Sequence, residues 1–313
     1  MDEQSVELTG SLAIRPKGTK KMIIYSQNDS TVYNIPDRAE YSYSGFIWLN
    51  KKDSLLCVEN IETSRRVPIK SNVVLLDNKG TIIRNITLME KGEFIQKVFP
   101  SPHDNYLFIT FMKNENKKVS DIFTAPISAF VIGFKDNELI RYSNNISPRI
   151  NFDINESPWS PDETKIVYSI IPKQAPIVIG EKQDKGKEIN PGIYIYDFSE
   201  NKHTKILDAG HNAVWSPMGR DIAYINNNSI YLYNTLDKTT KILYNGDGGK
   251  IELIHWTSEG KYLLVIEVKH RSHFDISINE SFVNVVSGEI IHIQEPKFGL
   301  NNFTWKGSIK IID

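Results

Sequence analysis

The feature of the sequence that most constrains its fold is a tryptophan-centred segment that recurs along the chain. Each of the five tryptophans ends a short apolar segment and precedes a polar turn, after which a second apolar segment follows. A sixth copy has phenylalanine in this slot. The six slot residues are Trp48, Phe99, Trp159, Trp215, Trp256 and Trp305. Their spacing, about 51 residues on average, lets six copies occupy all 313 residues, as in repeat architectures.

Each copy continues with two further strand-like segments. In the third copy these are residues 192–198 and 203–207, and in the fourth they are 229–234 and 240–244. The segments are rich in β-branched and aromatic residues and are bounded by Gly, Asn and Asp, which is typical of strands. Sustained helical periodicity is lacking, so the chain is predicted to be all-β.

Four antiparallel strands repeated six times predict a six-bladed β-propeller in a single domain, 1–313. A β-sandwich would not explain the repeat, and two unrelated β-domains would not share a motif. The approximate blade boundaries are 41–90, 91–145, 146–208, 209–248, 249–296, and 297–313 plus 20–36.

The last blade is predicted to be closed by strands from both ends of the chain. The C-terminal end supplies the strands 303–305 and 308–312, and the N-terminal end supplies 22–26 and 31–35. Joining them would close the ring and remove exposed sheet edges. Residues before about Lys20 are surplus to this scheme, apart from an additional strand at 11–15.

Composition excludes several classes of function. Lys+Arg 37 against Asp+Glu 38 gives a net charge of −1, which argues against a general electrostatic attraction to nucleic acid or an anionic membrane. No apolar run approaches the roughly 20 residues that span a bilayer. The single cysteine, Cys57, excludes an internal disulfide and a multi-cysteine metal site, and is interpreted as a small core residue. Residues 1–4 contain neither a basic nor an apolar segment, so no signal peptide is expected in this chain.

Two slots carry a recognisable motif. Trp159-Ser160-Pro161-Asp162 and the segment from Trp215 to Gly219 resemble the W-S-P-D-G signature of TolB-like propellers. The same signature marks the non-catalytic propeller of prolyl-oligopeptidase-type peptidases, and it identifies a blade, not an activity. The resemblance implies an exported propeller (periplasmic, cell-surface or secreted) that binds protein partners, whereas the residues alone leave a cytoplasmic location open. It extends to the propeller module only.

Strand order indicates where a binding site would lie. In an up-and-down blade, the connection into the first strand and the connection from the second to the third emerge on one face, termed the insertion face below. The second-to-third connection is short at 226–228, longer at 113–126 and longest at 172–191, with 269–275 in the fifth copy. Insertions in repeat proteins gather on one face, often the binding face. The alternative is that long polar loops are merely tolerated, because the closure cost rises slowly with length.

Polar residues shortly before the slots are predicted to edge the channel mouth on the insertion face. They are Gln96, Glu156, His211, Asn212, Glu252, Asn301 and Asn302. Polar groups converging on a shallow concavity would hold a peptide or a small ligand. The competing interpretation is that they hydrate the channel and satisfy strand ends.

Other chemistry receives less support. No G-x-S-x-G segment is present, so the peptidase resemblance brings no catalytic serine. The nearest approach to a metal site is His270, His273 and Asp275, but H-x-x-H-x-D in a loop lacks a characteristic frame, and a solvated loop is favoured. The lysines of the insertions alternate with acidic residues and lack grouped aromatics, which disfavours nucleic acid.

The leading hypothesis is a non-enzymatic propeller, without a cofactor, that presents loops and a polar channel mouth to a protein or peptide partner outside the cytoplasm. The alternative is a propeller lyase or hydrolase that uses channel-mouth histidine and carboxylates, with metal assistance at His270 and His273. A third hypothesis is a regulatory propeller that docks another catalytic chain.

Overall fold

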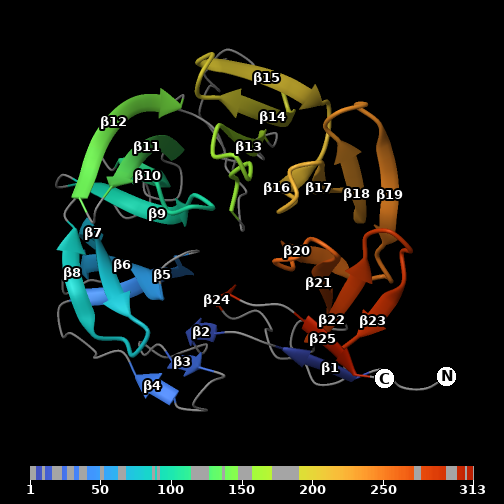
Figure 1. The fold of residues 1–313 in the computed structure, drawn as a ribbon, viewed down its shortest axis with the longest axis horizontal. Helices are drawn as coiled ribbons and strands as arrows, with labels where there is room; N and C mark the ends of the chain where they lie inside the picture. Colours follow the sequence, from blue (N-terminus) through green and yellow to red (C-terminus); the bar gives the residue numbers. More distant parts are fainter. Residues whose placement is uncertain are drawn as a thin grey trace, which may run out of the picture.

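The computed structural model shows an all-β propeller built from small antiparallel sheets (Figure 1). The structure describes residues 5–8, 11–15, 23–26, 32–34, 41–49, 53–62, 68–86, 89, 92–113, 127–135, 138–146, 157–170, 190–270, 276–293, 302–306 and 309–312. Within each sheet formed by consecutive strands, neighbouring strands follow one another along the chain. This up-and-down order is the one that the repeat predicted.

Four of the sheets each consist of four consecutive strands. The first is β5 (Tyr41–Trp48), β6 (Ser54–Glu62), β7 (Pro68–Asp77) and β8 (Ile82–Ile86). The next is β9 (Glu93–Pro100), β10 (Tyr106–Lys113), β11 (Ile127–Lys135) and β12 (Glu138–Ile146). The other two lie after β13–β15 along the chain. One is β16 (His211–Trp215), β17 (Asp221–Asn226), β18 (Ser229–Asn234) and β19 (Thr240–Asn245). The other is β20 (Lys250–Trp256), β21 (Tyr262–His270), β22 (Ile276–Asn284) and β23 (Ile290–His292).

The count of six four-stranded blades is wrong for the described residues, which form five such sheets. The sheet of β13 (Lys165–Ile170), β14 (Gly192–Asp197) and β15 (Lys202–Leu207) has three strands. In place of a first strand, Trp159 makes an isolated bridge to Ile166, and the Val167 N–H donates to the Pro158 carbonyl at 2.8 Å. Trp159 lies between prolines at 158 and 161, and proline cannot donate a ladder hydrogen bond, which limits pairing here.

The fifth four-stranded sheet joins the two ends of the chain, but not through the predicted strands. Its order is β24 (Asn302–Lys306), β2 (Ser11–Arg15), β3 (Ile23–Ser26) and β4 (Val32–Asn34). The place predicted for 308–312 is taken by β2, whose Ala13 is fully buried beside Trp48 and Leu55. The strand β25 (Ile309–Ile312) instead pairs with β1 (Ser5–Leu8) in a separate two-stranded sheet. Residues 11–15, which the sequence analysis left outside the blades, therefore complete this sheet.

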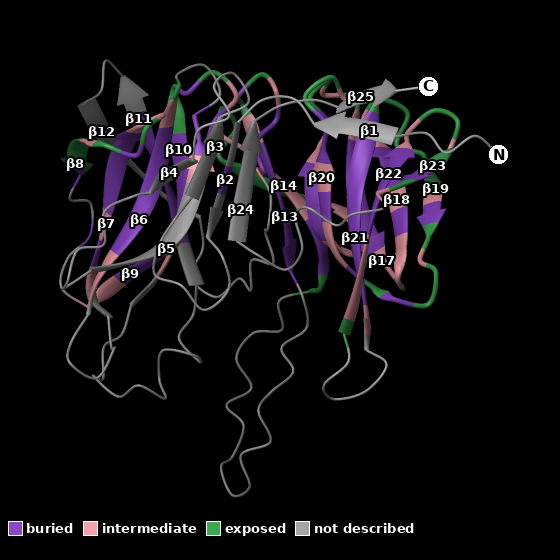
Figure 2. Ribbon diagram, turned by 90° about the horizontal axis from the view of Figure 1, so that it is seen from below, coloured by how far each residue is buried: buried purple, intermediate pink, exposed green. Residues whose placement is uncertain are grey.

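The slot residues pack between neighbouring sheets. Trp48, Phe99, Trp159 and Trp256 are buried, Trp215 is half-buried, and the side chain of Trp305 lies outside the described part. Buried residues, purple in Figure 2, lie along the strands, whereas exposed residues, in green, gather at the turns. The Trp159 indole N–H donates to the Phe99 carbonyl of the preceding sheet at 3.0 Å, and the Trp256 indole donates to the Val214 carbonyl at 3.4 Å. At Trp159 and Trp256 the slot residue thus links two sheets by packing and by a hydrogen bond.

The residue after the slot explains the serine of the W-S-P motif. In three sheets this residue directly follows the slot tryptophan. In the β9–β12 sheet it is Ser101, two positions after Phe99, because Pro100 pairs with Leu107 there as Trp159 pairs with Ile166 and Trp215 with Ile222, so the predicted slot is displaced by one residue. In all four sheets the hydroxyl accepts the backbone N–H of the residue five positions later. The pairs are Ser101 with Tyr106 (2.9 Å), Ser160 with Lys165 (2.9 Å), Ser216 with Asp221 (3.3 Å) and Thr257 with Tyr262 (3.2 Å). The hydroxyl therefore closes the tight turn that begins the second strand.

The fifth motif position requires a left-handed backbone. Gly219 and Gly260 adopt φ values of +73° and +67° there, which glycine does at little cost. Glu163, at φ +60°, and Asp104, at φ +59° and fifth when counted from Pro100, adopt the same conformation. The Glu163 carboxylate accepts hydrogen bonds from the His103 N–H at 2.5 Å and from the Asn105 amide at 2.8 Å. A side chain at this position therefore ties one turn to the turn of the preceding sheet.

The acid stability of the protein is expected to depend partly on Asp197, at the end of β14. Hydrogen bonds from the Ser199 hydroxyl (2.6 Å) and from backbone N–H groups, with Lys165 at 3.2 Å, lower the pKa of this carboxyl to about 2. Because the folded-state pKa lies below the unfolded value, this stabilisation is present above about pH 4 and is lost as the pH falls towards 2. We expect Asp197→Asn to lower the free energy of unfolding by about 1 kcal/mol at pH 7 and by less at pH 2. Urea unfolding of both proteins at the two pH values measures the difference, and an equal loss at both would contradict the prediction.

Candidate site: a cavity on the insertion face

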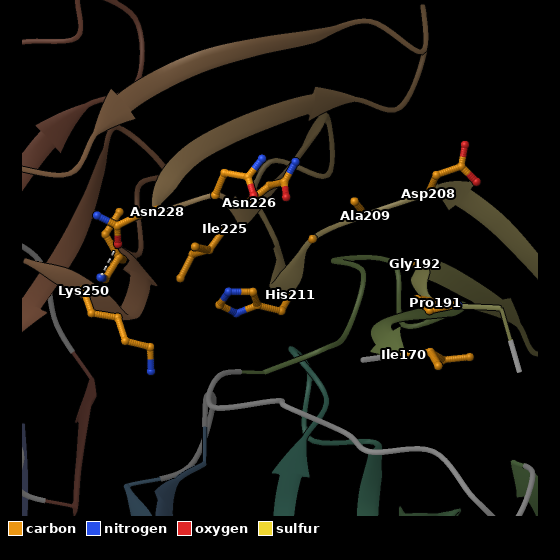
Figure 3. A pocket seen from close by; sticks show the side chains of 13 residues that line it. Ile170, Pro191, Gly192, Asp208, Ala209, His211, Ile225, Asn226, Asn228 and Lys250 are labelled. Carbon is orange, nitrogen blue, oxygen red and sulfur yellow. Dashed lines mark hydrogen bonds between the residues drawn. The ribbon is translucent and has the colours of Figure 1, made fainter. Parts of the chain in front are cut away.

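A cavity of about 720 Å³ lies where three neighbouring sheets meet (Figure 3). It is lined by Ile170, Pro191, Gly192, Asp208, Ala209, Gly210, His211, Ile225, Asn226, Asn227, Asn228, Lys250 and Ile251. These residues lie in two kinds of connection or at the strand ends beside them: the connections that enter the first strands β16 and β20, and those between second and third strands. The cavity therefore opens among the connections of the insertion face. Its volume is in the range of small-molecule and peptide sites.

The cavity combines an apolar wall with a few polar groups. Ile170, Ile225 and Pro191 supply apolar surface, and the His211 imidazole lies between them (Figure 3). The largely exposed Lys250 side chain lies at the edge of the cavity, where it pairs with Glu252 at 2.7 Å. The Asp208 carboxylate is directed away from His211 in this view, and it pairs with Lys205 at 2.8 Å. Such a mixture can hold a ligand that has both an apolar part and a hydrogen-bonding part.

Asn228 positions the edge of the cavity that carries Lys250. Its backbone is left-handed, at φ +60°, a conformation that asparagine tolerates well. Its side-chain amide donates to the Gly249 carbonyl at 2.6 Å, and its side-chain oxygen accepts the Ile251 N–H at 2.9 Å. Asn228 thereby fixes the entry of β20 to the β17–β18 turn. The sequence analysis did not select it, although the run of three asparagines at 226–228 is a signal for left-handed turn residues.

A buried carboxylate helps to hold the 246–249 connection, which leads into β20. Glu267, on β21, is 3% exposed and accepts the Asp247 N–H at 3.0 Å. Burial, followed by the nearby Glu267 charge, raises the pKa of the Tyr244 hydroxyl above its usual value. The Asp247 carboxylate pairs with Lys269 at 3.1 Å. These contacts hold the 246–249 connection in place beside the cavity.

The structure brings three of the predicted channel-mouth residues together. His211 lines the cavity, and the buried Asn212, at φ +51°, donates from its amide to the Glu252 carbonyl at 3.4 Å. The Glu252 carboxylate accepts from Lys250 at 2.7 Å. Gln96 lies on β9 and is not among the lining residues. Glu156 and Asn301 lie outside the described residues, as does the side chain of Asn302 at the start of β24.

The described residues that line this cavity include neither the metal candidates nor Cys57. His273 and Asp275 lie outside the described residues, as does the side chain of His270. Within the described ranges, no group of three His, Cys, Asp or Glu side chains is placed to hold a metal ion. Burial, and then the charge of Glu59, raises the pKa of the Cys57 thiol well above its usual value, so this residue is a poor nucleophile. No helix in the described part of the chain is long and apolar enough to cross a membrane.

Comparison with known proteins links this part of the chain to peptidases. The model of the dipeptidyl peptidase IV N-terminal region matches residues 181–259. All of the residues that line the cavity, except Ile170, lie in this stretch. Dipeptidyl aminopeptidase B of Saccharomyces cerevisiae is 23% identical over 245 residues, which cover 71% of this chain. The chain spans 28% of the length of that relative.

Solved structures show the same fold at low identity. A protein assigned as TolB from Agrobacterium tumefaciens is 13% identical, with a TM-score of 0.53 and 98% and 99% of the two chains covered. A puromycin hydrolase is 10% identical, with a TM-score of 0.62, 94% of this chain covered and 46% of the other. An oligogalacturonate lyase from Vibrio parahaemolyticus is 8% identical, with a TM-score of 0.55 and coverage of 93% and 84%. These likenesses define the chain as a β-propeller with TolB-like structural neighbours.

The comparisons overturn the leading functional hypothesis. A non-enzymatic binding protein was expected, but the relative found by sequence is an aminopeptidase and the matched family model describes part of a peptidase. The alternative of a hydrolase-type propeller fits these findings better. Fold likeness alone would not decide this point, because propellers host many unrelated functions.

Proposed function

We propose that this chain is the propeller of a peptide hydrolase and that the cavity on its insertion face receives the peptide. The observation that carries the proposal is the coincidence of two independent results. The stretch matched to the dipeptidyl peptidase IV N-terminal region contains every lining residue except Ile170. The stretch matched to the peptidase family model is therefore the part that forms most of the cavity.

The lining suits a peptide. At Gly192, Ala209 and Gly210 the wall carries little or no side chain, so the main chain of a ligand can approach the main chain of the protein. The apolar residues opposite would accommodate a side chain of the ligand. Because the lining residues are held by three neighbouring sheets, the cavity would bind such a segment without much rearrangement.

The role proposed for this chain in hydrolysis is to admit and orient the substrate. None of the thirteen lining residues is serine, threonine or cysteine, and the sequence contains no G-x-S-x-G segment. The lining residues that are able to transfer protons are Asp208, His211 and Lys250. The nucleophile in this proposal therefore comes from outside the cavity lining, as in the third hypothesis of a propeller that serves a catalytic partner.

Three further features belong to the proposal. The ring is counted as six blades in one domain, with the three-stranded sheet of β13–β15 as the third blade. The partner is a peptide. The location is outside the cytoplasm, which is supported by the TolB-like motifs at Trp159 and Trp215.

Hydrolysis of peptides by the protein isolated natively from its source cells tests the proposal. We expect release of dipeptides from the amino end of an unmodified pentapeptide, followed by mass spectrometry, together with cleavage of dipeptidyl nitroanilides. Ala209→Trp would place a large side chain at the cavity wall and is expected to raise KM at least 10-fold, whereas Gly248→Trp, in open space, is expected to leave it unchanged. Absence of any peptide cleavage in the native preparation would refute the function.

A further inference from the structure

We propose that a second copy of this chain docks on an apolar patch at the end of the sheets opposite the insertion face. The patch consists of Met218, Leu236 and Val286, whose exposed fractions are 74%, 75% and 86%. They lie in the turns that follow β16, β18 and β22, on the upper side of the molecule in Figure 2. The inference is independent of the proposed function, because the cavity opens at the other end of the same sheets.

The turn that carries Leu236 recurs in other sheets, where the equivalent residue is polar. In each copy, the side-chain oxygen of an Asn or Asp accepts the backbone N–H of the residue two positions later. The four pairs, each at 2.9 Å, are Asp77 with Lys79, Asp197 with Ser199, Asn234 with Leu236, and Asn284 with Val286. Because the same turn forms around lysine and serine, its geometry does not require an aliphatic residue at 236 or 286.

The turn that carries Met218 departs from its relatives in the same way. It follows the W-S-P-D-G signature from Trp215 to Gly219, except that methionine replaces aspartate. The residues at this position in the other copies of the turn are His103, Asp162 and Glu259. Asp162 accepts hydrogen bonds from the Ser160 hydroxyl at 2.6 Å and the Thr164 N–H at 3.1 Å, and methionine has no carboxylate for such bonds. Three positions that are polar elsewhere in the repeat are therefore apolar here, without a structural need.

The three apolar residues lie on turns that contact one another. The Met218 Cγ is 3.2 Å from the position that a Cβ would occupy on Gly260, so this side chain rests on the β20–β21 turn. Backbone hydrogen bonds join each outer turn to the inner turn of its own sheet, from the Thr235 N–H to the Arg220 carbonyl at 2.9 Å and from the Val285 N–H to the Lys261 carbonyl at 3.1 Å. Met218 therefore lies between the turns that carry Leu236 and Val286.

This arrangement suits a second copy of the same patch. Exposed apolar patches rimmed by polar residues mark interaction sites, and methionine adapts its shape to a partner. A two-fold axis beside Met218 would place the two methionines together and bring Leu236 of each copy against Val286 of the other, as in an isologous interface. The cavities of both copies would face outwards and stay open to their ligands.

The charges around the patch also favour a second copy. Exposed residues of both signs surround it: Arg220, Lys238, Lys241 and Lys261 with Asp237, Glu259 and Glu289. Two identical rims of mixed charge can set opposite charges against each other. An anionic lipid surface would instead attract a rim that is predominantly basic.

Sedimentation velocity of the 313-residue chain over a range of micromolar concentrations tests the inference. We expect a concentration-dependent species with twice the mass of one chain. The variant Met218→Asp/Leu236→Lys/Val286→Ser introduces at each position the residue type that another copy of the same turn carries, so the turns are expected to fold. It is expected to weaken self-association about 10-fold or more. Ile83→Lys changes an isoleucine that is 56% exposed on β8, outside the patch, and is expected to associate as the unmodified protein does.

Met218→Cys tests the two-fold arrangement, because an axis beside residue 218 brings the two new thiols together. Oxidised glutathione is expected to join the copies of this variant by a disulfide, whereas Ile83→Cys is expected to stay unlinked on a denaturing gel. Cys57 is fully buried and is not expected to react in either variant.

A chain that sediments as a monomer at every concentration would overturn the inference, whether or not another protein or a lipid vesicle then binds the patch. A dimer that the triple variant leaves intact would also overturn it, because the copies would then meet through another surface. Melting curves of the variants verify that they are folded.

Discussion

Trp159→Ala is expected to lower the free energy of unfolding by about 3–5 kcal/mol, the range for truncating a fully buried tryptophan. Trp159 is 3% exposed and stacks on Tyr106 and Phe198, with ring centroids 6.0 and 5.4 Å away. Its indole N–H also donates to the Phe99 carbonyl of the preceding sheet at 3.0 Å. The substitution therefore removes packing and a hydrogen bond between two sheets, and it does so where the first strand is reduced to one bridge.

Urea unfolding followed by fluorescence of the remaining tryptophans measures this loss. Trp159→Phe serves as a control that keeps an aromatic ring but removes the N–H, and it is expected to cost about 1–2 kcal/mol. Trp215→Ala, at a half-buried slot, is expected to cost less than Trp159→Ala. A loss below about 1 kcal/mol for Trp159→Ala would show that the slot residues do not hold the sheets together.

Gly210→Ala is expected to cost roughly 3 kcal/mol, although it adds a single methyl group. Gly210 adopts φ +120°, a conformation that residues with a Cβ rarely adopt. The new Cβ would lie 2.6 Å from Tyr224 Cδ2 and 2.9 Å from Ile193 Cδ1, both of which belong to buried side chains. Because the residue lines the cavity, the displacement it causes is also expected to weaken peptide binding.

Gly248→Ala provides the comparison for this variant. Gly248 has φ +71°, but a Cβ at this position would meet no heavy atom within 4 Å. The change is therefore expected to cost about 1 kcal/mol, from the backbone alone. Unfolding of the two variants under one set of conditions separates backbone strain from steric overlap. A similar cost for both would indicate that the contacts of Gly210 with Tyr224 and Ile193 relax freely.

Much of the architecture could be predicted because it is local. The slot tryptophans and the turn that follows them are read from adjacent residues, and the turn geometry is set by a hydroxyl and a left-handed fifth residue within the same hairpin. The alternation of apolar residues likewise depends on neighbours two positions apart. These patterns predicted an all-β chain with up-and-down sheets, which the structure shows.

The errors arose where pairing joins distant residues. Residues 11–15 and 309–312 both have strand-like patterns, and local sequence does not tell which one lies beside β24. Tertiary packing decides, because β2 places Ala13 against the Trp48 cluster. The reduced pairing at Trp159 likewise became evident only from its bridge to Ile166, although the flanking prolines offered a signal.

The candidate site, like the fold, could be predicted from the sequence only in part. The sequence selected His211, Asn212 and Glu252 by their place before a slot, and its strand order indicated the face on which they lie. It did not indicate that Lys250 and Ile170, 80 positions apart, line one cavity, or that Asn228 fixes the entry of β20. By itself, therefore, the sequence determined the repeat, the strands and their order, because these depend on short-range periodicity and turn chemistry. The tertiary structure alone decided which strands close the ring and which side chains share a cavity, because both depend on contacts between sheets that the repeat does not encode.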